Sequence, residues 1–146
     1  MTMIEKLKLK SQKQFELIDI TEQVKSAVSK SGLKNGTVTV FTPHTTASVR
    51  LNHNEPLLLQ DLMKMLYRLV PIDENYSHDL FEIRTGIKAN ERSNGHAHVK
   101  AFLLGSSETV PVENGQMLLG DRQSIFFVEL DGAREREAVV SVTDGG

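Results

Sequence analysis

Short segments in which apolar and polar residues alternate recur along this chain. In residues 4–11, for example, Leu7 and Leu9 alternate with lysines. Because the side chains of a β-strand point alternately to the two faces of a sheet, a period of two predicts a strand with one buried face. Several of these segments are separated by dipeptides typical of tight turns, namely Asn35-Gly36, Asn114-Gly115 and Asp131-Gly132.

This alternation predicts an antiparallel arrangement of many short strands. The predicted strands cover residues 4–11, 14–19, 37–42, 47–52, 96–104, 109–112, 116–119, 124–130 and 136–142. We expect the first two to pair with each other. In residues 96–104, the alternation places His96 and His98 on one face of the strand, with Ala97 and Val99 on the other.

Two segments have apolar residues at helical spacing. The first begins at Thr21, whose hydroxyl can cap the first turn, and Gly32 can take the left-handed conformation that ends it. The second has Pro56 in its first turn and extends to about Val70. Its apolar stripe consists of Leu58, Leu59, Leu62, Met63, Leu66 and Leu69. The predicted fold class is therefore α+β, a mainly antiparallel β-sandwich with two packed helices.

The composition is typical of one globular domain spanning residues 1–146. The chain has 17 basic and 19 acidic residues, a net charge of −2, and 39% hydrophobic residues. It lacks the basic excess of a nucleic-acid binder, so no nucleic acid is expected as a partner. We also expect no membrane contact and a cytoplasmic location, because we find neither the apolar core of a signal peptide nor a membrane-spanning apolar run.

The chain has no cysteine, so a metal site would depend on histidine and carboxylate ligands. His44 and His98 lie at or on predicted strands, whereas His78 lies in a polar segment, residues 71–95, long enough to be a functional loop. If these three imidazoles converge, they form an open site for a divalent metal ion, zinc or magnesium. Taken singly, each is more often a structural or surface residue. The remaining two are interpreted as surface residues: His53 and His96.

Four charged residues are candidates for chemistry beside the histidines. Asp61 and Glu129 lie within otherwise apolar elements, where burial would raise their proton affinity unless a cation or donor compensates. They are therefore candidate acids, bases or orienting partners of a histidine, with exposure to solvent as the alternative. Arg134 and Arg136 follow at a turn, where they can clamp a phosphate by bidentate contacts or simply lie on a hairpin surface.

An ordered set of motifs, covering about residues 15–142, resembles the YjbQ-like family. The set comprises His44-Thr45-Thr46-Ala47-Ser48, Asn52, Asn54, Asp61, Tyr76-x-His78, Asn94 to Ala101, Leu104-Gly105-Ser106-Ser107, Pro111-Val112-x-x-Gly115, Leu119-Gly120 and Gln123. The resemblance implies a β-sandwich-like α+β fold, a homotrimer, and clustering of His44, His78 and His98 as a metal or ligand site. Members are often labelled secondary thiamine-phosphate synthase.

The chain departs from the family pattern at two places that bear on a ligand. Arg122 stands where the family commonly has tryptophan, which puts any stacking role of that ring in doubt. His53 stands where many members have glutamate, and it would supply a fourth ligand or none.

Taken with the resemblance, the residues predict a small metal-dependent enzyme with thiamine-phosphate synthase-like activity. The activity joins a pyrimidine pyrophosphate to a thiazole phosphate with loss of pyrophosphate, which requires compensation of the leaving group's charge. We expect Glu129 or Asp61 to be the acid or base. The residues expected to bind a small phosphorylated molecule are Asn52, Arg134 and Arg136. The alternatives are a binding protein without turnover and a structural trimer whose histidines stabilise an interface.

Overall fold

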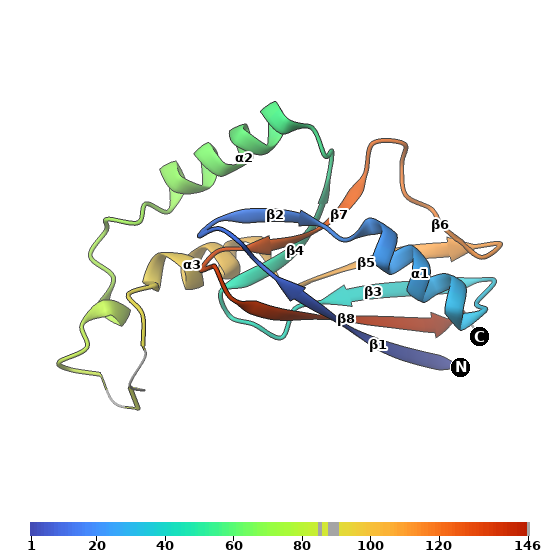
Figure 1. Ribbon diagram of the computed structural model, residues 1–146, viewed down its shortest axis with the longest axis horizontal. Coiled ribbons are helices and arrows are strands. Elements are labelled where there is room, and N and C mark those ends of the chain that lie inside the picture. The colour runs from blue at the N-terminus through green and yellow to red at the C-terminus, as the bar shows by residue number, and fades with distance from the viewer. Residues whose placement is uncertain (85, 88–90, 146) are drawn as a thin grey trace.

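The protein is built from two antiparallel sheets, with helices packed at their faces (Figure 1). A computed structural model describes residues 1–84, 86–87 and 91–145. The five-stranded sheet has the order β1-β8-β3-β5-β6, with β1 (Thr2–Lys10), β3 (Gly36–Phe41), β5 (Ser107–Glu113), β6 (Gln116–Met117) and β8 (Glu135–Asp144). The three-stranded sheet has the order β2-β7-β4, with β2 (Glu16–Asp19), β4 (Ala47–Asn52) and β7 (Ser124–Glu129). The predicted α+β class is confirmed.

Strand β7 is buried on both faces and connects the two hydrophobic cores. Ile125 and Phe127 pack in the core formed by both sheets and by α1 (Thr21–Ser31). Phe126 and Val128 point the opposite way and pack against α3 (Gly95–Leu104). Successive side chains of β7 therefore point into two different apolar cores, which explains why this strand is almost continuously hydrophobic.

The first two strands form as predicted, but they do not pair with each other. β1 pairs with β8, where Leu7 faces Ala138, and β2 pairs with β7, where Leu17 faces Val128. The segment between them carries the chain from one sheet to the other (Figure 1). The predicted pairing is wrong because alternation determines which face of a strand is buried, not which strand lies beside it.

The predicted strand over residues 96–104 is wrong, since these residues form helix α3. Ala97 and Ala101, four residues apart, share the helical face that packs on Phe126 and Val128. The strand prediction placed Val99 on the same face as Ala97, but Val99 is 44% exposed. A short apolar run fits both periods, and here packing against the three-stranded sheet selects the helix.

The two predicted helices form, with different capping from that expected for the first. In α1, Gly32 has a φ of 69°, as predicted, but Thr21 is the first helical residue and caps nothing. Its hydroxyl instead donates to Asp19 and accepts from the backbone N–H of Ile125. In α2 (Pro56–Leu69), Glu55 caps the first turn by accepting from two backbone N–H groups.

Helix α2 is only partly covered by its own chain, since most residues of its apolar stripe are half-buried. Within α2, Leu66 alone is buried, whereas Leu57 and Leu69 are more than half exposed. The helix projects beyond the sheets in Figure 1 and contacts the body partly through Tyr67, whose ring lies 5.9 Å from that of Phe15. The loop prediction over residues 71–95 includes the short 3₁₀-helix η1 (Ser77–Asp79), while residues 85 and 88–90 of it lie outside the described residues. Within the described ranges, no helix combines the length and apolarity needed to cross a membrane.

We predict that Gly36→Ala destabilises the protein by about 1–3 kcal/mol, the usual cost of overpacking. Gly36 lies at the start of β3 between β5 and β8, and an added Cβ would overlap the backbone oxygen of Thr143. The control is Gly120→Ala, whose Cβ would meet Gln123 at an ordinary 3.5 Å. Urea unfolding measures both variants, and equal midpoints for them would contradict the prediction.

Candidate functional site

A polar pocket of about 400 Å³ lies where the β3–β4 turn, the segment before α3 and the start of β8 meet. We call it the His44 pocket. It is lined by Pro43, His44, Thr45, Thr46, Glu91, Arg92, Asn94, His98, Arg134 and Arg136. Residues far apart in the sequence therefore meet here, and three of them are arginines.

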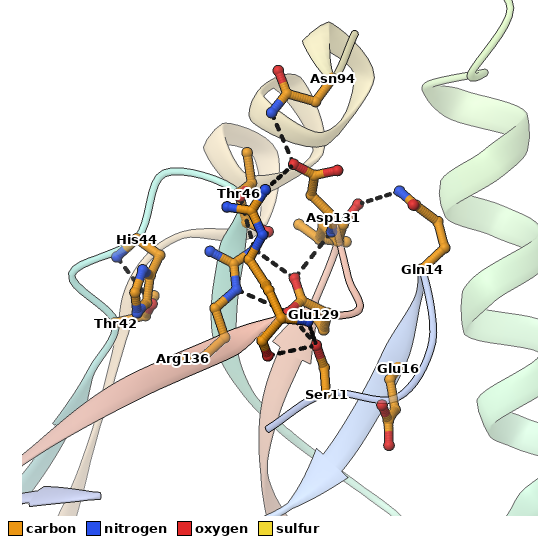
Figure 2. Close-up of polar contacts among 12 residues, drawn as sticks. Ser11, Gln14, Glu16, Thr42, His44, Thr46, Asn94, Glu129, Asp131 and Arg136 are labelled. Carbon is orange, nitrogen blue, oxygen red and sulfur yellow. Dashed lines mark hydrogen bonds and ion pairs between the residues drawn. The ribbon is translucent and has the colours of Figure 1, made fainter. Parts of the chain in front are cut away.

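A buried ion pair between Arg136 and Glu129 forms the base of this region (Figure 2). The guanidinium donates to both carboxylate oxygens, at 2.8 and 2.5 Å. Glu129 also accepts from the Ser11 hydroxyl at 2.7 Å and from the backbone N–H of Asp131 at 3.0 Å. Arg136 in turn donates to the backbone oxygen and hydroxyl of Thr46, which lies in the turn carrying His44.

These contacts give Glu129 a role different from the predicted acid or base. Burial by itself raises the pKa of its carboxyl, but the hydrogen bonds from Arg136, Ser11 and Asp131 outweigh this effect and hold the pKa below 4.5. The carboxylate is fully buried, and both of its oxygens accept hydrogen bonds from protein donors. Glu129 therefore positions Arg136 instead of facing a ligand.

Asp131 gathers three further polar side chains at the rim of the pocket. Its carboxylate accepts from Asn94 at 2.8 Å and from Arg134 at 3.2 Å. Arg92 donates to its backbone oxygen at 2.8 Å and lies 3.4 Å from its carboxylate. Sequence reasoning missed Arg92 and Asn94 as site residues. The available signal was their place in the polar segment 71–95, the candidate functional loop.

His44 is held in one tautomer by the backbone. Its Nε2 accepts the N–H of Glu137 at 3.0 Å, so in the neutral ring Nδ1 carries the proton. Burial, and then the charge of Arg136, holds the pKa of His44 below its usual value of 6.5. His44 therefore presents a neutral ring with its remaining N–H available as a donor.

His78 and His98 form a contacting pair on the other wall. Their ring centroids are 4.6 Å apart, with the planes at 70°. Burial and the neighbouring His78 lower the pKa of His98, which lines the pocket together with His44. The three predicted histidines thus lie in one region, two of them lining the pocket and the third behind His98.

The donor set does not fit the expected three-histidine metal centre. In the described part of the chain, no group of three or more histidine, aspartate or glutamate side chains converges closely enough to hold a metal ion. His44 already uses Nε2 as an acceptor for a backbone N–H. Binding a metal through Nδ1 would therefore require removal of the proton that the neutral ring carries on Nδ1. The metal ion stays a prediction, and no chemical step below depends on it.

Three buried polar atoms have no partner among the described residues, and all three lie in or beside the His44 pocket. They are Arg134 Nε, Asn94 Oδ1 and His78 Nε2. Buried polar groups are nearly always paired, because each unpaired group costs about 1–3 kcal/mol. Arg134 and Asn94 line the pocket, so a bound polar molecule can supply the missing contacts.

Two predicted site residues lie elsewhere, and one histidine was misjudged. Asp61 is exposed on α2, and Asn52 is exposed at the end of β4, where its side chain accepts from the backbone of His53; neither lines the His44 pocket. His96, predicted to be a surface residue, is only 4% exposed. The interpretation of His96 is wrong because the buried face of an element depends on the neighbouring elements.

We predict that Glu129→Gln lowers the free energy of unfolding by about 3–5 kcal/mol, because it leaves the buried Arg136 without its counter-charge. Since the folded pKa of Glu129 lies below its ordinary value of 4.5, the carboxylate contributes stability above that value and loses it as the pH falls through the folded pKa. Wild type should therefore lose more stability than the variant below about pH 4.5.

Urea unfolding between pH 3 and 7, on a scale of about one pH unit per step, measures both effects. The control is Glu108→Gln, which removes the partly exposed pair with Arg50 and should cost less than about 1 kcal/mol. Equal costs for the two variants would contradict the assigned role of the buried pair.

Comparison with known proteins places this architecture in a family. The model of the UPF0047 protein YjbQ-like family matches residues 5–145. A UPF0047 protein from Methanothermobacter thermautotrophicus is 44% identical over 94% of this chain and 90% of its own length. The UPF0047 protein YugU of Bacillus subtilis is 33% identical over 96% of this chain and 98% of its own.

Solved structures agree with the sequence relatives. A YbjQ-like protein of unknown function from Sulfolobus solfataricus superposes with a TM-score of 0.89 and 33% identity, covering 99% of this chain and 98% of its own. An uncharacterised YjbQ/UPF0047 family protein from Clostridium acetobutylicum gives a TM-score of 0.84 and 37% identity, with 95% and 99% covered. The predicted family is therefore confirmed: the chain belongs to the UPF0047, or YjbQ-like, family.

Proposed function

We propose that the His44 pocket binds a small phosphorylated molecule. The observation that carries the proposal is the group of three arginines lining one pocket, with the buried Nε of Arg134 unpartnered. Two carboxylates, Glu129 and Asp131, orient these arginines, and the carboxylate in the lining itself, Glu91, is paired with Arg84. Arginine binds phosphate oxygens through geometrically matched N–H groups, and such preformed donors suit an anion.

The proposed activity is that of a secondary thiamine-phosphate synthase-like transferase. In this reaction a pyrimidine pyrophosphate and a thiazole phosphate are joined, and pyrophosphate leaves with the electron pair of its bond to carbon. Arg92, Arg134 and Arg136 can offset the charge that develops on the leaving group. The thiazole nitrogen forms the new bond to that carbon without loss of a proton; His44 can donate from Nδ1 to the leaving group, and His98 lines the same pocket and can position the substrates.

A binding protein without turnover is the second candidate, and one observation favours it. The hydrogen bonds to Glu129 and Asp131 are already made by protein donors, so neither carboxylate is available as a general base. Acid–base chemistry would then depend on the histidines. Binding a phosphorylated metabolite in the same pocket requires no acid or base.

We also propose that the protein assembles as a homotrimer, with apolar surface covered between subunits. Phe102 on α3 is 92% exposed, and Leu57 and Leu69 of α2 are more than half exposed. Exposed apolar surface of this kind is typical of interfaces between subunits. Sedimentation of the purified protein tests the proposal directly.

We predict that Arg134→Gln weakens the binding of inorganic pyrophosphate by about tenfold to a hundredfold, the effect of losing charged hydrogen bonds worth about 1.5–3 kcal/mol. Calorimetric titration measures the affinity. The control is Arg122→Gln, which removes an exposed arginine that does not line the pocket and should leave the affinity unchanged. Equal affinities for wild type and Arg134→Gln, with the fold intact, would contradict anion binding in this pocket.

We predict measurable thiamine phosphate formation by wild type given the pyrimidine pyrophosphate, the thiazole phosphate and magnesium, and at least a tenfold loss in His98→Gln, as expected for loss of a side chain that positions the substrates in the pocket. A parallel assay with a chelator instead of magnesium tests the predicted metal. If wild type forms no more product than His98→Gln while still binding pyrophosphate, the protein is a binder and not this enzyme.

A further inference from the structure

A second pocket, of about 530 Å³, lies beside the His44 pocket and shares Arg92 with it. We call it the His96 pocket after the buried histidine in its wall. Its polar lining consists of Gln14, Arg92, Ser93, His96 and Asp131. The pocket lies at the N-terminal end of α3, where a helix favours negative charge.

Beneath the His96 pocket is a buried lysine. Lys100, one turn after His96, is 1% exposed, and its Nζ lies 2.8 Å from His96 Nδ1. Its ammonium also lies 4.7 Å from the centre of the Tyr67 ring, which belongs to α2. A lysine ammonium has donors and no acceptor, so Lys100 is the donor in its contact with His96.

Lys100 determines which ring nitrogen of His96 carries the proton. A protonated amine can only donate, so His96 Nδ1 must accept and the proton of the neutral ring must be on Nε2. An Nδ1 that accepts a hydrogen bond carries no proton, so the ring is neutral. Since Nδ1 is engaged, the Nε2–H group is the part of His96 available to the pocket.

Burying the ammonium of Lys100 costs free energy, which points to a role beyond packing. A buried ammonium loses its hydration, and among the described residues one imidazole nitrogen and one aromatic ring compensate for this loss. An apolar side chain of similar length would avoid this cost. Through its contact with His96, Lys100 fixes a neutral donor, the Nε2–H group of His96, next to the guanidinium of Arg92. This pair of donors suits an oxyanion.

We propose that the His96 pocket is a second phosphate-binding site, in which His96 Nε2–H and Arg92 are the donors and Lys100 is a positioning residue that holds the tautomer of His96. The inference extends the proposed function, because Arg92 joins this pocket to the first. The carboxylate of Asp131 does not oppose an anion here, since it is already paired with Arg134 and hydrogen-bonded by Asn94. The protein then accommodates two phosphate groups, one on either side of Arg92.

Nitrogen NMR of protein labelled in its histidine rings tests the tautomer first. We expect His96 to show a protonated Nε2 and an unprotonated Nδ1 in wild type. In Lys100→Met, which removes the donor but keeps the length and apolar volume, we expect a substantial fraction of the Nδ1–H tautomer. The control is Lys64→Met, an exposed lysine on α2, which should leave the His96 signals unchanged. An Nδ1–H tautomer in wild type would overturn the proposal.

Titration with inorganic phosphate in the same spectra tests binding. We expect the Nε2–H signal of His96 to shift on saturation, and its apparent affinity to fall about tenfold in Lys100→Met, the effect of losing one oriented charged hydrogen bond. The signals of His44 and His98, which report the first pocket, should keep their affinity in that variant. A purely structural lysine would change stability without changing the tautomer or the His96 titration.

The two proposals fail in different ways. Phosphate shifts at His44 and His98 but not at His96 would overturn the second site and leave the proposed function intact. Shifts at His96 alone would support the second site and contradict anion binding in the first. No saturable shift at any of these rings, with the fold intact, would contradict both.

Discussion

The buried ion pair between Arg136 and Glu129 is the interaction on which the rest of the site depends. Two charges removed from water are stabilised only if their hydrogen bonds are satisfied, and here the partners come from four separate parts of the chain. Ser11 precedes β2, Thr46 precedes β4, and Glu129 and Arg136 belong to β7 and β8. The pair thus fixes the two sheets relative to each other at the edge where the His44 pocket opens.

Helix α3 organises the two pockets in a similar way. Its small residues Ala97 and Ala101 allow close packing on β7, which brings the segment before the helix against Asp131. The helix places His98 in one pocket and His96 in the other. Arg92 therefore lines both pockets, and Asp131, which lines the His96 pocket, accepts hydrogen bonds from Asn94 and Arg134 of the His44 pocket.

Much of the framework could be predicted from local patterns, and the failures have a common cause. The turn at Asn114-Gly115, with both residues at positive φ, and the helix end at Gly32 followed from residue type alone. His44 and His98, singled out from the sequence, line the same pocket. The pairing of β1, the helical state of residues 95–104 and the engaged state of Glu129 were missed, because each depends on which distant strand or side chain lies opposite.

The sequence by itself determined the family, the α+β class and the residue types available for chemistry, since a cysteine-free chain leaves histidine, arginine and carboxylates. Only the tertiary structure decided what these residues do. Folding pairs Glu129 with Arg136, gives His44 and His96 their tautomers, and leaves the Nε of Arg134 without a partner beside the pocket. The physical reason is that hydrogen bonding and desolvation set the charge and availability of a side chain, and both depend on neighbours that are remote in sequence.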